Sequence, residues 1–135
     1  MEKEIVIDGT NATLGRLASY AAKQSLLGSS VIIVNANRVV IVGSKADIID
    51  KYKKSISRGG TSMKGPNIIR TPERILKRTV RGMLSYKDGR GSAAIDRVIC
   101  YNETPAKYEN VKKIIAGKEK SGKFITLKEL VERIK

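Results

Sequence analysis

The chain has 135 residues, with 27 lysines and arginines against 13 aspartates and glutamates, and therefore a net charge of +14. This length suits a single domain, expected over residues 1–135, and the apolar fraction of 41% is ordinary for a folded protein. No apolar run approaches the roughly eighteen residues of a membrane span. Histidine is absent, which excludes the catalytic triads and zinc sites that depend on it.

The positive charge is concentrated in one part of the chain. Residues 1–50 carry five basic and five acidic side chains, whereas residues 51–90 carry twelve basic and two acidic ones, a net of +10. Residues 91–135 carry ten and six, a net of +4. We therefore expect a basic block at 51–91 that faces an anionic partner.

In chain order, the first expected elements are a strand and a helix. Residues 5–7, "IVI", have the β-branched pattern of a strand. A helix is expected from Leu14 to about Leu27, with Thr13 as its N-cap and Gly28 as its stop.

The next run of apolar residues predicts two further strands. Residues 31–35, "VIIVN", are typical of a strand buried on both faces, and the β-α-β order indicates a parallel sheet with a right-handed crossover. Residues 39–42 follow too closely for a parallel crossover, so this strand either turns back as an antiparallel one or continues as a bent one. A helix from Ser44 to about Lys54 and a loop over 55–70 complete this half.

The second half is expected to hold two helices and one strand. Thr71 and Pro72 form a strong helix start. Residues 94–101, "AIDRVICY", predict a last buried strand, in which Cys100 is a core residue. A C-terminal helix over about 126–135 begins with the capping box Thr126 and Glu129. Its apolar face packs on its own domain or docks on a neighbouring protein, and both alternatives stay open.

The segment 8–18, "DGTNATLGRLA", lies where phosphate-binding loops are found. It lacks the P-loop lysine and the hydroxyl that holds magnesium, since Arg16 and Leu17 stand there, and it lacks the GxGxxG pattern. We expect a simple strand-to-helix turn in which Gly15 permits close packing. A weaker expectation is that Arg16 and the helix N-terminus contact an RNA phosphate.

The helix that starts at Thr71 has an unusual cationic face. At 100° per residue, Arg74, Lys77, Arg78 and Arg81 fall within an arc of about 100°, opposite the aliphatic residues. Like charges at i, i+4 repel, so an anionic partner explains this stripe better than a solvated charged face does. A membrane surface is the rival partner, but membrane-binding helices usually insert aromatic residues, which this face lacks.

Basic residues and glycines flank this helix on both sides. Gly82, Gly89 and Gly91 are expected to let the backbone approach phosphates. The chain has one Phe and no Trp, so recognition of shape and backbone fits better than stacking on single strands. The residues expected to bind RNA are Arg16, Lys53, Lys54, Arg58, Lys64, Arg70, Arg74, Lys77, Arg78, Arg81, Gly82, Lys87 and Arg90.

Four segments together resemble one known family. These are "DGTNATLGRLAS" (8–19), "VNANRVVIVG" (34–43), "RTPERILKRTVRGML" (70–84) and "GRGSAAIDRVICYNETPAKY" (89–108). In their order and spacing they resemble the ribosomal protein 13 family of the large subunit, and the short C-terminus is similar to its archaeal members. The resemblance covers nearly the whole chain.

The resemblance implies a fold and a role. The implied fold is α/β, a three-layer α/β/α single domain with a mainly parallel four-stranded sheet. The implied role is structural: the chain would bind large-subunit rRNA and neighbouring ribosomal proteins in the cytoplasm and support early subunit assembly. No enzyme activity, cofactor, metal, membrane or small-molecule substrate is expected.

The resemblance also assigns residues to the RNA side of the molecule, namely Arg70, Arg74, Arg78, Arg81, Gly82, Lys87 and Arg90. This chain departs from the family pattern after Leu84, where Ser85 and Tyr86 replace a proline and a basic residue or histidine. Two other hypotheses stay open. One is a free-standing RNA-binding regulator outside the ribosome, and the other is a nucleotide-dependent enzyme that uses Gly15 and Arg16.

Overall fold

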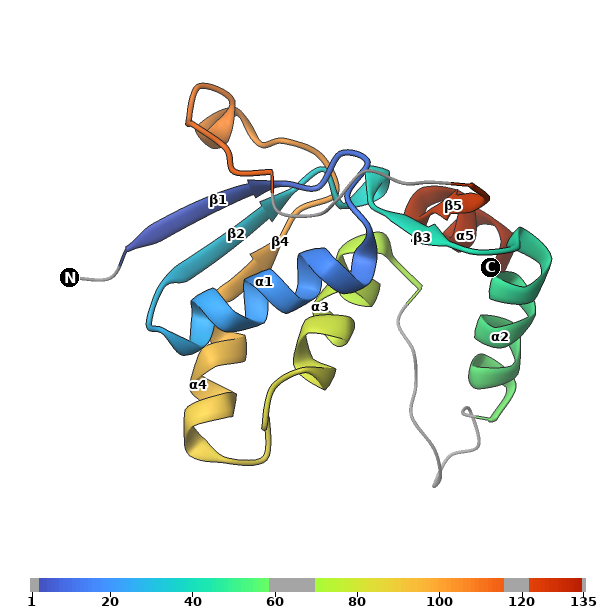
Figure 1. The fold of residues 1–135 in the computed structure, drawn as a ribbon, viewed down its shortest axis with the longest axis horizontal. Coiled ribbons are helices and arrows are strands. Elements are labelled where there is room, and N and C mark those ends of the chain that lie inside the picture. Colours follow the sequence, from blue (N-terminus) through green and yellow to red (C-terminus); the bar gives the residue numbers. More distant parts are fainter. Residues whose placement is uncertain (1–2, 59–69, 116–121, 135) are drawn as a thin grey trace.

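The computed structural model describes residues 3–58, 70–115 and 122–134, and for Ser57 and Arg58 it describes the backbone only. Within these ranges no helix is long and apolar enough to cross a membrane. Figure 1 shows the elements, which in chain order are β1 (Glu4–Asp8), α1 (Leu14–Leu26), β2 (Ser30–Val34), the 3-10 helix η1 (Ala36–Arg38), β3 (Val40–Val42), α2 (Lys45–Arg58), α3 (Pro72–Gly82), α4 (Gly89–Asp96), β4 (Val98–Cys100), the 3-10 helix η2 (Ala106–Tyr108), β5 (Phe124–Thr126) and α5 (Leu127–Ile134).

The centre of the fold is a parallel sheet with the strand order β1-β2-β4. β1 and β2 pair over five residues, and β2 pairs with β4 over three. Helix α1 connects the first two strands, so the predicted parallel β-α-β unit is confirmed. Side chains alternate along the strands as the pleat requires: Ile33 lies in the large core, whereas its neighbour Ile32 lies in a small cluster on the other face.

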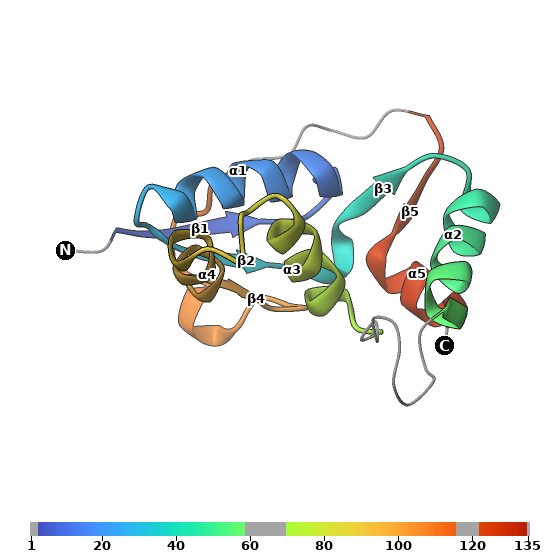
Figure 2. The same cartoon turned by 90° about the horizontal axis from the view of Figure 1, so that it is seen from below.

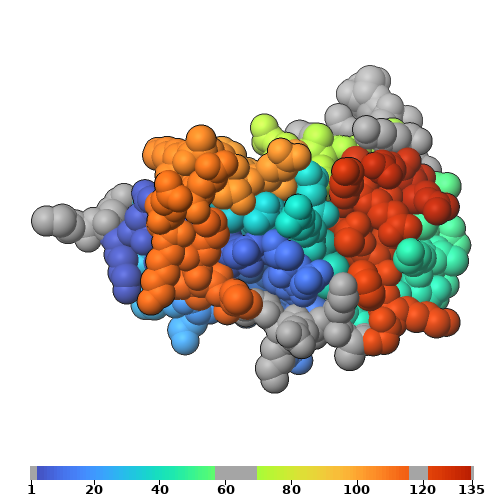
Figure 3. Space-filling model, turned by 90° about the horizontal axis from the view of Figure 1, so that it is seen from above, coloured from blue at the N-terminus to red at the C-terminus, as the bar shows by residue number. Residues whose placement is uncertain are grey.

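The two faces of this sheet have different covers. Figure 2 shows α1, α3 and α4 side by side in front of the strands. On the opposite side, Figure 3 shows the segment 101–115 lying across the sheet, and Tyr108 of this segment packs against Val6, Ile32 and Val34. The described residues therefore confirm an α/β fold, but they do not confirm the expected second layer of helices.

A two-stranded antiparallel sheet forms a separate part of the fold. β3 pairs antiparallel with β5 from the far end of the chain and not with the preceding strand β2, so residues 39–42 do not turn back beside β2. The parallel sheet consequently has three strands among the described residues, and the expected four-stranded sheet is not confirmed. Helix α5 packs against α2, α3 and η1, so its apolar face is buried within its own chain.

Two expected boundaries are wrong. Helix α2 continues to Arg58 instead of ending near Lys54, so residues 55–58 are helix and not loop, while residues 59–69 of the expected loop lie outside the described residues. Residues 94–101 were expected to form one strand, but α4 extends to Asp96 and only Val98–Cys100 is strand. The helix forms because Gly91 allows α4 to touch the preceding turn: a Cβ at this position would lie 1.9 Å from the Ser85 carbonyl oxygen.

Helix starts are stabilised partly by distant residues. Thr13 and Thr71 occupy N-cap positions but make no side-chain capping hydrogen bond. For α3 the acceptor is Asn102, whose Oδ1 receives a hydrogen bond from the Glu73 backbone N–H at 3.1 Å. In α5 the predicted capping interaction is present, since the Glu129 N–H donates to Thr126 Oγ1 at 3.2 Å.

The turn after β1 is closed by its own side chains. Asp8 Oδ1 accepts hydrogen bonds from Thr10 N–H at 3.0 Å, Thr10 Oγ1 at 2.7 Å and Asn35 Nδ2 at 3.0 Å. The close packing expected at Gly15 occurs instead at Gly9, where a Cβ would lie 2.8 Å from Val39 Cγ2. At Gly15 no atom would lie within 4 Å of a Cβ, so the expectation for Gly15 is wrong.

Candidate nucleic-acid interface

Helix α3 is fixed to the core by one face and presents cations on the other. Ile75, Leu76 and Val80 are almost fully buried, and α3 packs against α1 and β4. The predicted division of this helix into an apolar side and a cationic side is therefore confirmed. Its orientation is set by the core and by the Asn102 cap.

The cations of α3 spread over a wide strip of surface. Arg74 is exposed, whereas Lys77 and Arg78 are half-buried on either side of it. Burial raises the pKa of the Cys100 thiol to about 12, although the charge of Lys77 acts in the opposite direction. Burial likewise raises the pKa of Tyr52, against the charge of Arg78. Lys77 thus lies toward β4 and Arg78 toward α2, with Arg74 between them.

Arg81 is held in place by an aromatic ring. Its guanidinium carbon lies 4.8 Å from the centre of the Tyr86 ring, within the range of a cation–π interaction. The Arg81 Nε atom is buried and has no hydrogen-bond partner among the described residues. Tyr86 replaces the residue that the family resemblance would predict here, and its ring packs against the last turn of α3 through this contact.

A hydrogen-bonded turn leads from α3 into α4. The Tyr86 N–H donates to the Leu84 carbonyl at 2.9 Å, and the Asp88 N–H donates to the Ser85 carbonyl at 3.0 Å. Lys87 and Arg90 are exposed beside the N-terminus of α4, where the helix dipole adds positive charge. The segment after α3 is thus a turn followed by a helix, and Gly91 packs closely against the Ser85 carbonyl group.

We call the cations on α3 and just before it, on the turn that follows it and at the start of α4 the α3–α4 cationic surface. Within the described ranges, none of its members takes part in a salt bridge. Two of its pairs, Arg74 with Arg78 and Lys77 with Arg81, are like charges at i, i+4 and repel each other. The surface consists of Arg70, Arg74, Lys77, Arg78, Arg81, Lys87 and Arg90.

The other predicted residues lie around this surface or outside the described part of the chain. Helices α4, α3 and α2 follow one another across the lower half of Figure 1, and exposed Lys53 and Lys54 are on α2. Gly82 ends α3 and is exposed. Arg16 is exposed in the first turn of α1. Lys64 and the side chain of Arg58 are outside the described residues.

Sequence reasoning missed one cation. Lys23 lies in the last turn of α1 and, together with Arg90, lines a hollow between α1 and α4. The helical pattern places Lys23 on the side of α1 opposite its apolar residues, and the side chain is exposed there. Only the packing of α4 against the end of α1 brings it close to the basic block.

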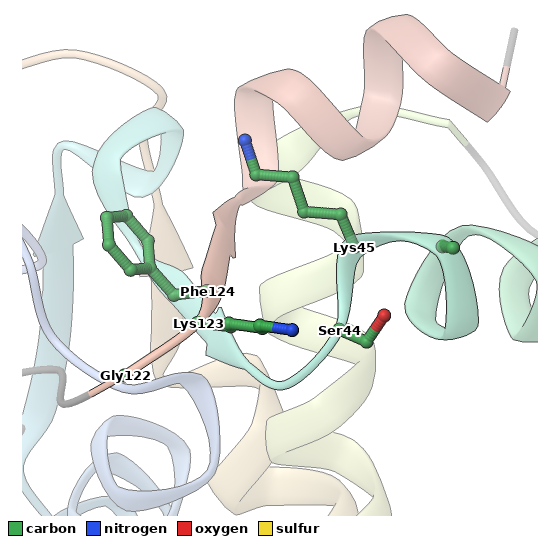
Figure 4. A pocket seen from close by; sticks show the side chains of 6 residues that line it. Ser44, Lys45, Gly122, Lys123 and Phe124 are labelled. Carbon is green, nitrogen blue, oxygen red and sulfur yellow. The ribbon is translucent and has the colours of Figure 1, made fainter.

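A second hollow, at the N-terminus of α2, also contains lysines. Figure 4 shows that Lys123 points toward Ser44, whereas Lys45 points away from it. Lys45 Nζ forms a salt bridge of 3.1 Å with Glu129 Oε1, so its charge is already balanced. This hollow has a volume of about 450 Å³ and adds a smaller positive area beyond α2.

Catalytic groups do not gather at any of these places. Within the described ranges, no three residues among His, Cys, Asp and Glu lie close enough together to hold a metal ion. The one thiol, Cys100, is held in its neutral form by burial. An α/β fold with a cationic face that forms no salt bridge among the described residues is typical of proteins that bind a polyanion.

Comparison with known proteins identifies the family. Residues 2–107 match the family model described as ribosomal protein L13. The chain is 44% identical to the large ribosomal subunit protein uL13 of Methanococcoides burtonii, covering 90% of this chain and 91% of the relative. It is 42% identical to that of Methanosarcina barkeri, covering 96% of both, and 40% identical to that of Archaeoglobus fulgidus, covering 93% and 83%. The chain belongs to the ribosomal protein L13 family.

Proposed function

We propose that this chain is a structural constituent of the large ribosomal subunit and binds large-subunit rRNA through the α3–α4 cationic surface. Two observations carry the proposal together. The chain matches the family over most of its length, and the cations of its α3 face form no salt bridge among the described residues. The chain would act as one domain and support early subunit assembly, with neighbouring large-subunit proteins as further partners.

The mechanism is neutralisation of phosphates. Packed RNA helices repel one another through their backbones, and a row of arginines and lysines between them lowers this repulsion. Arginine also makes bidentate contacts with phosphate oxygens. Because α3 is fixed by its apolar face and by Asn102, its cations are positioned before RNA binds, and little ordering is needed on binding.

A salt titration tests the proposal. If about six to eight phosphates are neutralised, the affinity for an rRNA transcript should fall with a log–log slope of about −5 to −7 in filter binding. A slope near −1 would contradict this role for the surface.

Charge variants locate the contact. Arg70→Gln with Arg74→Gln removes two exposed cations, and we expect the slope to become shallower by about 2 because two phosphate contacts are lost. The matched control is Lys112→Gln with Arg133→Gln, which removes two exposed cations elsewhere. Equal changes for both pairs would show that the α3–α4 cationic surface is not the site.

The alternative role is a free-standing RNA-binding regulator. Sucrose-gradient fractionation of cell extracts in high salt separates the two roles. Co-migration with large subunits supports the ribosomal role, and recovery only in light fractions supports the regulator.

A further inference from the structure

A hollow lies beside the α3–α4 cationic surface, between the end of α1 and the turn that follows α3. Its volume of about 630 Å³ is within the range of roughly 300–1,000 Å³ typical of small-molecule sites. We call it the α1–α4 hollow. The residues that matter here are four apolar ones and two cations: Ala22, Leu26, Leu27, Met83, Lys23 and Arg90.

The apolar walls of this hollow are more exposed than folding alone explains. Leu27 is 68% exposed and Met83 45% exposed, although both are large apolar side chains. They come from different elements, the C-terminal cap of α1 and that of α3, and they meet at one place. Apolar surface gathered in a hollow and rimmed by polar groups is typical of a binding site.

The charge of the hollow restricts what it can hold. Lys23 and Arg90 line it, and no acidic residue of the described part of the chain does. The basic tail of another protein would be repelled, and an apolar helix would leave both cations without a partner. An occupant with a flat apolar part and a negative charge fits both features, and a nucleotide has this composition.

Tyr86, three residues after Met83, provides an aromatic ring on which a base could stack. The Tyr86 ring is 42% exposed, while Arg81 covers it at 4.8 Å. Bases that leave an RNA stack bind to aromatic rings and guanidinium groups, typically with a gain of roughly tenfold per base.

We propose that the α1–α4 hollow holds one unstacked nucleotide of RNA, with the base against Leu27 and Met83 and the phosphate between Lys23 and Arg90. This inference rests on the proposed function and extends it. The α3–α4 cationic surface contacts the RNA backbone whatever the base, whereas the hollow requires a base that is free of its stack. The protein would therefore recognise a particular bulge or junction rather than any packed helix.

Two RNA probes test the inference with the full chain. One is a single-stranded ten-nucleotide oligoadenylate, and the other is an abasic strand of the same length, which keeps the phosphates. We expect the first to shift the Met83 methyl signal in NMR spectra and to bind about tenfold more tightly than the second. Met83→Gln should remove most of this advantage and leave abasic binding unchanged.

The control variant is Ile115→Gln, because Ile115 is 78% exposed but belongs to the segment on the other face of the sheet. It should leave binding of both probes unchanged, and circular dichroism checks that both variants are folded. Equal affinity for the two probes, or an unmoved Met83 methyl signal, overturns the inference. If rRNA binding keeps its steep salt dependence in that case, the proposed function stands and only the nucleotide site fails.

A crosslinking experiment tests the same site in assembled large subunits. Leu27 is replaced by the photoreactive p-benzoylphenylalanine, which its exposure allows without disturbing the core. We expect a crosslink to rRNA at an unpaired nucleotide. A crosslink to another ribosomal protein without RNA, or to base-paired RNA only, overturns the inference.

Discussion

The two faces of the parallel sheet are covered by different means. On one face, α1, α3 and α4 bury a large apolar core together with the strands. On the other, the segment 101–115 covers a small cluster around Tyr108 and is held by polar contacts at the sheet edge. There Thr104 Oγ1 donates to Asn35 Oδ1, Asn35 donates to Asp8, and Ile114 forms a bridge with Ile7.

The two faces therefore differ in what stabilises them. The helical face depends on apolar burial, which does not change with pH, and it carries the α3–α4 cationic surface. The opposite face depends on the carboxylate of Asp8 and on a few hydrogen bonds. We expect mutations to divide in the same way, and the following predictions run from the largest effect to the smallest.

Ile33 and Ile32 are neighbours on β2, and their side chains lie on opposite faces of the sheet. Truncating each one compares how much the two faces contribute to stability. Ile33→Ala should reduce the free energy of unfolding by about 4 kcal/mol, because it opens a cavity in the large core. Ile32→Ala should cost about 2 kcal/mol, because the segment above it can settle into the space. Urea denaturation measures both. Equal losses of unfolding free energy would mean that the helices and the segment 101–115 pack equally tightly on their faces of the sheet.

Gly91 tests how tightly α4 is fixed on the helical face. Gly91→Ala should cost about 3 kcal/mol, since the new Cβ would overlap the Ser85 carbonyl oxygen and force α4 away from the turn. The control is Gly89→Ala, where no atom lies within 4 Å of the added Cβ, and it should be neutral or stabilise by about 0.5 kcal/mol. Thermal unfolding distinguishes them, and a neutral Gly91→Ala would contradict the packing role.

Asp8 tests the polar attachment of the opposite face. Partial burial alone would raise the pKa of Asp8, but hydrogen bonds from Asn35 and Thr10 and the charge of Lys113 outweigh it, so the pKa lies below its usual value of 3.8. The carboxylate therefore stabilises the fold above pH 3.8, and this contribution is lost as the pH falls through the lowered folded-state pKa.

We expect Asp8→Asn to cost about 1 kcal/mol at pH 7 and the difference from the unmodified chain to vanish once the pH is below the lowered folded-state pKa. Hydrogen exchange provides the local measurement. The Asp8 and Ile114 amides, which bond to Ile114 O and Val6 O, should lose protection on acidification before the amides of α1 do. Simultaneous loss would show that the segment 101–115 does not open separately.

The smallest expected effect concerns the contact between Tyr86 and Arg81. Tyr86→Leu should cost about 0.5–1 kcal/mol because the cation–π contact is lost. Tyr86→Phe keeps the ring and serves as the control, with a change close to zero. Thermal unfolding measures both variants, and equal losses would assign the effect to the Tyr86 hydroxyl rather than to the ring.

The elements that sequence predicted well depend on local signals. Helix α1 was expected from Leu14 to about Leu27 and ends at Leu26, since the apolar period and Gly28 are both local. The stripe on α3 and the Thr126 capping interaction follow from helical spacing for the same reason.

The features that sequence could not predict depend on distant partners. Strand β5 has three residues and exists only because β3 pairs with it. Helix α4 begins with Gly89, Arg90 and Gly91, which are typical of a loop, and it forms where Gly91 meets the preceding turn. Lys23 joins the basic block only through packing of α1 against α4. The rRNA-binding residues themselves stay predictions.

The Asn102 cap has a consequence for the order of events during synthesis. Asn102 lies 29 residues beyond Glu73 and two residues after the end of β4. A growing chain therefore completes the sequence of α3 well before it can cap the first turn, and the cap forms only once β4 has joined β2. Until then the arginines of α3 are attached to a helix with a frayed start. The helix that carries Arg74, Arg78 and Arg81 thus reaches its final alignment late, when most of the chain has already been made.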